Sequence, residues 1–415
     1  MFWLGIAIVV LTFVAIIKRY ETRMVLFTSG LVMALVSGQF IQAINAFTKT
    51  MVHGTLVPVI CTVMGFAYVM KYTKCDAHMV RLLAGSMTKM RPVLIPGTVI
   101  LTFLINIALP SAAGCAAAVG AIMIPTMMAS GIHPAIAASA VMAGTFGGTL
   151  SPGTAHAPFI ANLAGIDVMS VIAGHMTSAI VCAFIAAFGL YIVAVLRKEQ
   201  SGYVSQEIAE AEDFKINYVK AFVPVFPLLL LILGSKQLQI IPLVSVPQAM
   251  LFGTIVGLVV SRCNPQELTK QFFNGLGHAY GGIIGLIVCS AVFTKGMELI
   301  GITRELIDVM KSSDQIATFA AGFGPMIIAA LCGSGDAATL AFNGAVTPHA
   351  AAFGFQISDL GSAAFLSGTF GRAISPVAGA AIVCAQLANI DPIEISKRNA
   401  LGMFAAAITS MIIML

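Results

Sequence analysis

The sequence predicts an all-α polytopic membrane protein that is built from two inverted repeats. Of its 415 residues, 59% are apolar and only 9% are charged, against about 25% in an average soluble domain. Two long regions are nearly free of charge yet rich in Gly, Pro, Ser and Thr, and they resemble each other. This composition excludes a cytosolic enzyme, a nucleic-acid binder and a disordered protein. It leaves a protein embedded in the lipid bilayer with roughly ten or more crossings.

Apolar segments long enough to cross the membrane, or nearly so, occur throughout the chain. They lie at about residues 2–17, 24–46, 53–70, 92–109, 217–235, 246–261, 279–297 and 315–332. The first has no basic residue before it and no small-x-small cleavage site after it, so we interpret it as a membrane helix rather than a signal peptide. The eight cysteines form no C-x-x-C pair, which indicates small core residues.

The two halves of the chain are homologous. Residues 143–152 (AGTFGGTLSP) match residues 367–376 (SGTFGRAISP) at six of ten positions, at a spacing of 224. At the same spacing, LAGID at 163–167 matches LANID at 387–391. We therefore predict repeat one at 1–196, repeat two at 217–415 and a polar cytoplasmic linker at 197–216.

Basic residues predict the orientation of each half. We place the loops after the first and third segments in the cytoplasm, which puts most basic residues inside, both termini outside and Arg372 within the membrane. The inside residues are Lys18, Arg19, Arg23, Lys71, Lys74, Arg81, Lys89, Arg91, Arg197, Lys198, Lys215, Lys220, Arg262, Lys270, Lys397 and Arg398, and the outside residues are Lys49, Lys236, Lys295, Arg304 and Lys311. The halves then have opposite orientations, which is typical of a secondary transporter.

Two predicted helix breaks in each half form the candidate binding site. A hairpin tip lies at 110–114 and 333–337, and an unwound helix lies at 145–154 and 369–377. Broken helices offer free N–H groups to an anion and free carbonyls to a cation near the middle of the membrane. The alternative interpretation is that these small residues only let helices pack tightly. The candidate substrate-binding residues are Ser111, Ala112, Gly114, Thr145, Gly147, Thr149, Ser151, Ser334, Gly335, Asp336, Thr369, Gly371, Arg372 and Ser375.

Arg372 replaces Gly148 of the other half within the matched motif. A cation in the membrane needs a partner, and the planar guanidinium suits a carboxylate in two-point contact. The alternative is a structural contact with Asp336 or with hairpin carbonyls.

Asp336 is the acid of the second hairpin tip, and three roles remain open for it: to carry a coupling proton, to bind Na⁺, or to neutralise Arg372. Na⁺ is expected, if it is the coupling ion, near Ser111, Thr149, Asp336 and Ser375, and no other cofactor is expected. Two histidines near the breaks, His156 and His349, are either proton relays or simply hydrogen-bonded. Three further acids are predicted to be helix N-caps, namely Asp167, Asp359 and Asp391.

At these motifs the sequence resembles the DcuC family of anaerobic four-carbon dicarboxylate transporters. The motifs are GSGDA at 333–337, GRAISPV at 371–377 and ISKR at 395–398, and the resemblance covers nearly the whole chain. It implies succinate, fumarate or malate as substrate, a bacterial inner membrane and a homodimer. It also implies scaffold helices at about 1–91 and 217–311, and a mobile transport part with two hairpins at about 92–196 and 312–415. The chain departs from the family at Asp336, where Asn is common, and at 110–113 (PSAA), where Ser-Ser is common.

We interpret the chain as a secondary active carrier of four-carbon dicarboxylates that works by alternating access, with an elevator-type motion, as an exchanger or an ion-coupled symporter. The alternatives are a carrier of another organic acid, a Na⁺/H⁺-type antiporter of the same superfamily, a membrane-embedded hydrolase and a channel. The sequence contains no evident Ser–His–Asp arrangement, metal cluster or cofactor motif, which disfavours an enzyme. Inverted repeats with two hairpins favour a carrier over a channel.

Overall fold

The computed structural model describes residues 2–18, 20–54, 56–85, 93–203, 215–234, 239–303, 305 and 314–415. Within these ranges the only regular secondary structure is helix, with no β-strand. The all-α prediction is therefore confirmed. Several residues used for the orientation argument lie outside the described ranges: Arg19, Lys89, Arg91, Lys236, Arg304 and Lys311, with most of the linker.

The helices of the first half are α1 (Phe2–Ile17), α2 (Thr22–Val36), α3 (Phe40–Met51), α4 (Leu56–Thr73), α5 (Cys75–Gly85), α6 (Leu94–Ala108), α7 (Ala112–Ala129), α8 (Pro134–Gly144), η2 (Gly147–Leu150), α9 (His156–Ala164) and α10 (Val168–Leu196). Those of the second half are α11 (Tyr218–Phe222), α12 (Phe226–Leu233), α13 (Val246–Ser261), α14 (Pro265–Ala279), η3 (Tyr280–Ile284), α15 (Gly285–Leu299), α17 (Asp314–Cys332), α18 (Gly335–Ala345), η4 (Thr347–Phe353), α19 (Ile357–Ala373), α20 (Gly379–Ala388) and α21 (Pro392–Met414).

Three of the predicted apolar segments differ from the helices. The segment 24–46 is divided between α2 and α3 by a turn at 37–39, and the segment 217–235 is divided between the short helices α11 and α12. The segment 279–297 starts too late, because α14, the π-helical turn η3 and α15 continue one another. Hydropathy does not predict this part of the helix, because α14 contains many polar residues.

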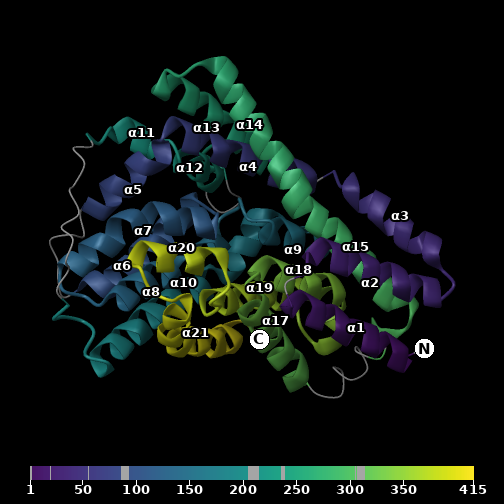
Figure 1. Cartoon of the computed structure of the whole chain (residues 1–415). Helices are drawn as coiled ribbons and strands as arrows, with labels where there is room; N and C mark the ends of the chain where they lie inside the picture. The colour runs from purple at the N-terminus through teal and green to yellow at the C-terminus, as the bar shows by residue number, and fades with distance from the viewer. Residues whose placement is uncertain are drawn as a thin grey trace.

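Figure 1 shows this composite helix running diagonally through the molecule. Its first part packs against α4, and its last part packs against α2 and α3. The π-helical turn between the two parts is held from the first half of the chain. Arg23 Nη1 donates to the Gly281 carbonyl (2.6 Å), and the Tyr280 hydroxyl donates to the Met51 carbonyl (3.1 Å).

Helices of both halves share the largest apolar core. This core joins α6–α10 to α19, α20 and α21 and contains the fully buried Phe146, Phe365 and Phe370. The rings of Phe146 and Phe370, which are equivalent in the two repeats, meet edge to face at 5.2 Å. Long helix α10 packs along α21, where the Cys182 thiol donates to the Ala406 carbonyl (3.2 Å).

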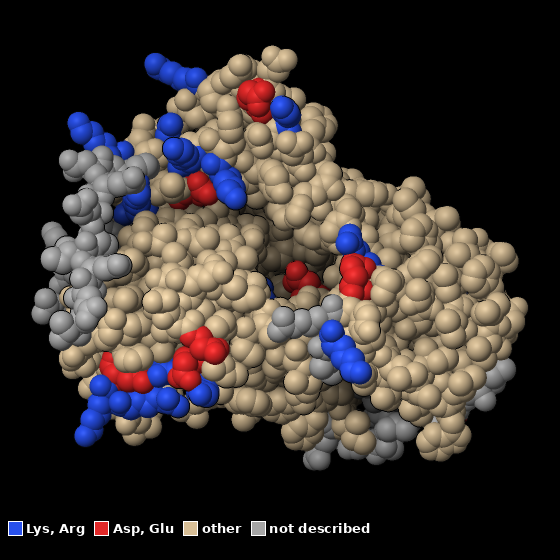
Figure 2. Space-filling model, viewed as in Figure 1, with Lys and Arg blue, Asp and Glu red and all other residues tan. Residues whose placement is uncertain are grey.

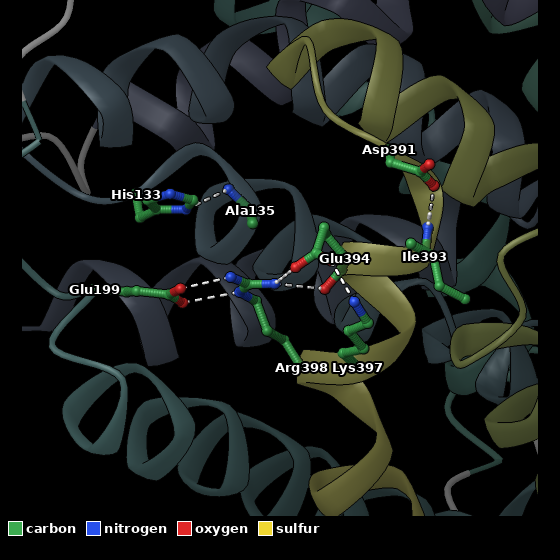
Figure 3. A network of polar contacts seen from close by, with 8 residues as sticks. All are labelled: His133, Ala135, Glu199, Asp391, Ile393, Glu394, Lys397 and Arg398. Atoms are coloured by element: carbon green, nitrogen blue, oxygen red, sulfur yellow. Dashed lines mark hydrogen bonds and ion pairs between the residues drawn. The ribbon is translucent and has the colours of Figure 1, made fainter.

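A network of charges at one end of α21 attaches the start of the linker to the second half (Figure 3). Arg398 is buried and donates to both carboxylate oxygens of Glu199, at 2.8 and 2.5 Å, and to Glu394 at 2.6 Å. Lys397 also donates to Glu394 (2.6 Å), and the backbone N–H of His133 donates to the Glu199 carbonyl (3.0 Å). A paired and buried guanidinium of this kind holds its partners in fixed positions.

Two of the three predicted N-caps are confirmed. Asp167 caps α10 by accepting from Met169 N–H, and Asp391 caps α21 by accepting from Ile393 N–H, each at 2.9 Å. The prediction for Asp359 is wrong, because Gln356 is the N-cap of α19 and Asp359 lies in the first turn. A carboxylate there still complements the positive end of the helix dipole.

Within the described residues, four continuous helices have the length and composition to cross a membrane: Leu56–Thr73, Ala112–Ala129, Val168–Leu196 and Pro265–Leu299. Further apolar helices are shorter than the roughly 20 residues that a full crossing requires. Such short apolar helices are the expected product of breaks within the membrane.

Two glycines of the matched motifs allow the closest helix contacts around the breaks. A Cβ on Gly147 would lie 1.9 Å from the Phe103 carbonyl oxygen, and a Cβ on Gly371 would lie 2.1 Å from the Met326 carbonyl oxygen. Each repeat therefore packs its broken helix directly on the backbone of its first hairpin helix, α6 or α17. Both glycines are required for packing.

We expect Gly147→Ala to lower the free energy of unfolding by about 1–3 kcal/mol, because overpacking forces the backbones of η2 and α6 apart. Gly174→Ala is the matched control, since a Cβ at this exposed helical position meets nothing within 4 Å. Thermal unfolding of the purified variants in detergent measures both. Equal melting temperatures for the two variants would contradict the close-packing role.

Candidate functional site

Both hairpin tips are built in the same way. The first hairpin helix ends at Ala108 or Cys332, and the second begins after a serine N-cap. Ser111 Oγ accepts from Gly114 N–H (3.2 Å), and Ser334 Oγ accepts from Ala337 N–H (3.1 Å). A serine that accepts in this way keeps its own proton free to donate. Both predicted hairpin breaks are confirmed.

The predicted break in the first half is also confirmed. Helix α8 ends at Gly144, a single 3₁₀ turn follows, and α9 begins at His156. Asn106 on α6 supports this turn, because its Oδ1 accepts from Gly148 N–H (2.5 Å) and its Nδ2 donates to the Leu109 carbonyl (2.8 Å). His175 Nε2 lies 2.9 Å from the Thr149 carbonyl oxygen. Two side chains thus satisfy backbone groups that the break leaves without helical partners.

The break in the second half is shorter than predicted. Helix α19 continues to Ala373, so Thr369, Gly371 and Arg372 are helical and only residues 374–378 are unwound. The first half has Gly-Gly at 147–148, whereas the second half has one glycine followed by Arg and Ala, which favour the helix. Asn399 Nδ2 donates to the Ala373 carbonyl (3.3 Å), at the position that His175 occupies in the first repeat.

The breaks surround a cavity of about 340 Å³. Figure 2 shows a hollow near the middle of one face, with acidic atoms inside it and basic and acidic groups close to its right-hand edge. The walls come from both halves: the first hairpin tip, η2, the start of α9, α18, α19 and the start of α20, closed on one side by α4, α14 and η3. Seven predicted site residues line it: Ser111, Ala112, Thr145, Thr149, Asp336, Thr369 and Arg372.

The other seven predicted residues do not line the cavity. Gly147 and Gly371 serve packing, and Gly114 donates its N–H to Ser111. Ser334 caps α18, and Gly335 lies against the Gly368 backbone. Ser151 and Ser375 are buried and accept from the N–H groups of Gly153 (3.3 Å) and Val377 (3.4 Å). For these residues the packing interpretation is the better one.

Arg372 joins the two halves at the cavity. Its Nη2 donates to the carbonyl of Thr145 (2.8 Å), the residue that caps the C-terminal end of α8 at the break of the first half. Its Nε is buried without a hydrogen-bond partner. It makes no ion pair with Asp336, so that structural alternative is wrong, and its carbonyl partner belongs to the broken helix rather than to a hairpin. A buried N–H without an acceptor leaves the guanidinium with donor capacity for an anion.

Asp336 pairs with His156 instead. His156 Nε2 lies 2.9 Å from Asp336 Oδ1, and the imidazole stacks on Phe365 with ring centroids 4.3 Å apart. The Asp336 side chain is 62% exposed, toward the cavity, whereas the His156 side chain is 3% exposed. His349 lies on η4 and does not line the cavity.

The threonines of the site do not supply donors to an anion. The hydroxyls of Thr145, Thr149 and Thr369 donate to the carbonyls of Met142 (2.7 Å), Phe146 (2.9 Å) and Leu366 (2.7 Å). Among the predicted site residues that line the cavity, side-chain donor capacity therefore rests on Arg372 and Ser111. Of the residues proposed for Na⁺, Ser375 is outside the cavity.

Sequence reasoning missed Asn106, His175, His278 and Asn399. His278 on α14 lines the cavity, and the other three support the breaks. One signal was available, because His175 and Asn399 are a polar pair at the repeat spacing of 224 within apolar helices.

Comparison with known proteins decides the family. The sequence profile of the DcuC family, described as C4-dicarboxylate anaerobic carrier, matches residues 2–415. The chain belongs to the DcuC family. The predicted resemblance is thereby confirmed, and the chain is a membrane transport protein and not an enzyme.

Individual relatives agree with this assignment. The chain is 24% identical to the anaerobic C4-dicarboxylate transporter DcuC of Escherichia coli, over 95% of this chain and 92% of the relative. It is 37% identical to an uncharacterized transporter of Haemophilus influenzae, over 64% of this chain and the whole relative. The crystal structure of the YdaH transporter of Alcanivorax borkumensis has the same fold, with a TM-score of 0.61 at 12% identity over 90% of this chain and 87% of that one.

We expect Asn106→Ala to destabilise the protein by about 1–3 kcal/mol for each backbone group that it leaves buried without a partner. Asn274→Ala, on the exposed face of α14, is the control and should leave stability unchanged. Thermal unfolding in detergent reports the difference. An Asn106→Ala variant as stable as Asn274→Ala would mean that Asn106 does not support the break.

Proposed function

We propose that this chain carries four-carbon dicarboxylates, such as succinate, fumarate and malate, across a bacterial inner membrane by secondary active transport. The observation that carries the proposal is Arg372, the basic residue of a cavity formed by both halves of a DcuC-family protein. A half-buried guanidinium whose buried Nε has no acceptor is well suited to recognise a carboxylate.

The cavity suits a small dianion in size and chemistry. Its volume of about 340 Å³ lies at the small end of the usual range for ligand sites. Arg372 would bind one carboxylate, and the free Ser111 proton at the first hairpin tip would be donated to the other. The partial positive charge at the start of α7 supports an anion there.

We propose an elevator-type mechanism of alternating access in a homodimer. The equivalent contacts in the two halves support the repeat: the serine caps of the hairpins, the packed glycines and the polar supports at 175 and 399. Inverted repeats with a site at their interface are typical of such carriers. The mobile part would comprise about 92–196 and 312–415, and the scaffold about 1–91 and 217–311. The wall formed by α4, α14 and η3 would then be the surface along which the cavity slides.

Purified protein in liposomes tests the proposal. Uptake of labelled succinate, and its exchange for internal succinate, should both be saturable and should be inhibited by fumarate and malate. Neither activity in well-folded protein would refute the proposed substrate class. Exchange without net uptake would identify an exchanger, and net uptake that needs an ion gradient would identify a symporter.

We expect Arg372→Ala to weaken succinate binding by about 2–5 kcal/mol, because a buried charge contact is lost. Arg372→Lys should have a smaller effect, since it keeps the charge but loses the two-point geometry. Arg262→Lys and Arg262→Ala, at the exposed end of α13, are the matched controls. Unchanged succinate affinity in Arg372→Ala would exclude Arg372 from the site.

We expect both termini on the outer face, as the distribution of basic residues predicts. A cysteine introduced at Leu415 should react with an impermeant maleimide in intact cells, and one at Ser201 at the start of the linker should not. The parent for both is a variant without native cysteines. The reverse labelling pattern would overturn the proposed topology.

A further inference from the structure

The His156–Asp336 pair is the ionisable contact that crosses the cavity between the two halves. His156 begins α9 and Asp336 lies in the first turn of α18, so the partners are 180 positions apart. They meet at a wall of the cavity in which Arg372 also lies. The ring of His156 is fixed by its stacking on Phe365, which leaves its two nitrogens in defined positions.

One nitrogen of His156 has no partner. Nε2 faces Asp336, but Nδ1 is buried without any hydrogen bond. With Asp336 ionised, Nε2 must carry a proton, so Nδ1 is the atom at which the imidazole gains or loses charge. A buried polar atom without a partner calls for a structural or functional explanation.

The geometry favours protons over a bound metal cation at this pair. With Asp336 ionised, its Oδ1 faces a ring N–H, and a cation bound to that oxygen would lie against the partial positive charge of this hydrogen.

Other ionisable groups surround the pair. On the elements packed against α9 and α18 these groups include His175, Cys182 and Tyr191 on α10, Cys61, Tyr68, Lys71 and Tyr72 on α4, Cys289, Lys295 and Glu298 on α15, Cys332 on α17, His349 on η4, and Asp359 and Arg372 on α19. The ionisable residues that line the cavity are Asp336, Arg372, His156 and His278. His175, on the other side of Phe365, has both ring nitrogens engaged by Ser362 (3.1 Å) and the Thr149 carbonyl (2.9 Å).

Charge balance in the cavity gives the number of protons. With neutral imidazoles, Arg372 and ionised Asp336 cancel. A four-carbon dicarboxylate brings two negative charges at neutral pH, and uncompensated charge at low dielectric is costly. One proton on His156 Nδ1 and one on the Asp336 carboxyl would leave the cavity with two positive charges, which balance the dianion.

We propose that the His156–Asp336 pair is the coupling-proton site of this carrier, and that one dicarboxylate moves together with two protons without net charge. The inference rests on the proposed function, since it takes a dicarboxylate as the substrate. The protons come from the bulk solution on one side and are released with the substrate on the other.

The test uses liposomes that contain a pH-sensitive dye, a K⁺ gradient with valinomycin to set the membrane potential, and labelled succinate. The wild-type protein should move two protons per succinate in net uptake, and the rate should not depend on the potential. Asp336→Asn imitates the protonated acid, so it should move one proton per succinate and become dependent on the potential. His156→Gln should do the same, and exchange in both variants should be reduced but measurable.

Asp359→Asn, outside the cavity, is the matched control and should keep the wild-type ratio of two. An unchanged ratio in Asp336→Asn and His156→Gln, or uptake that follows a Na⁺ gradient at constant pH, overturns the inference. Absence of exchange and uptake in the wild-type protein refutes the proposed function instead. If the variants do not fold, the test is proton uptake by the wild-type protein in weakly buffered detergent when succinate binds. We expect about two protons per bound succinate, and no proton uptake would overturn the inference.

Discussion

The need to satisfy backbone groups within the membrane determines the rest of this structure. A helix that unwinds in lipid surroundings exposes N–H and C=O groups that water cannot reach. Here Asn106 provides for Gly148 and Leu109, His175 for Thr149, and Asn399 for Ala373. Because these three side chains hold the broken ends, the breaks have fixed shapes, and the cavity between them has fixed walls.

The two halves use this common scheme for different purposes. In the first half the Gly148 N–H donates to Asn106, so this N–H is not available to a ligand. In the second half the helix runs on to Ala373 and presents Arg372 in its last turn, beside the Thr145 carbonyl of the first half. A symmetric framework thus carries an asymmetric chemical group. In the proposed transport function, this asymmetry would give a bound anion a defined orientation.

Sequence analysis could predict the class, the positions of the breaks and seven of the residues that line the cavity. These follow from composition, from glycine and proline, and from the repeat. It could not predict which residues meet across the cavity. An ion pair of Asp336 with Arg372 was one of the alternatives left open, whereas Asp336 contacts His156, since that pairing depends on how α9 and α18 approach each other. Helix α14 was missed because its polar face conceals a continuous helix. The glycines assigned to ligand binding are instead required for packing, a difference that depends on distances of a few ångströms.

The charge network around Arg398 adds a polar connection between the halves to the peptide chain and the apolar core that they share. It consists of the buried contact of Arg398 with Glu199, reinforced by the bond from His133 to the Glu199 carbonyl. This polar connection would survive a cut in the chain after residue 203. The contact between the halves therefore resembles an interface between two separate subunits. The linker keeps the halves close together in a one-to-one ratio, whereas the side chains of the interface determine how they fit.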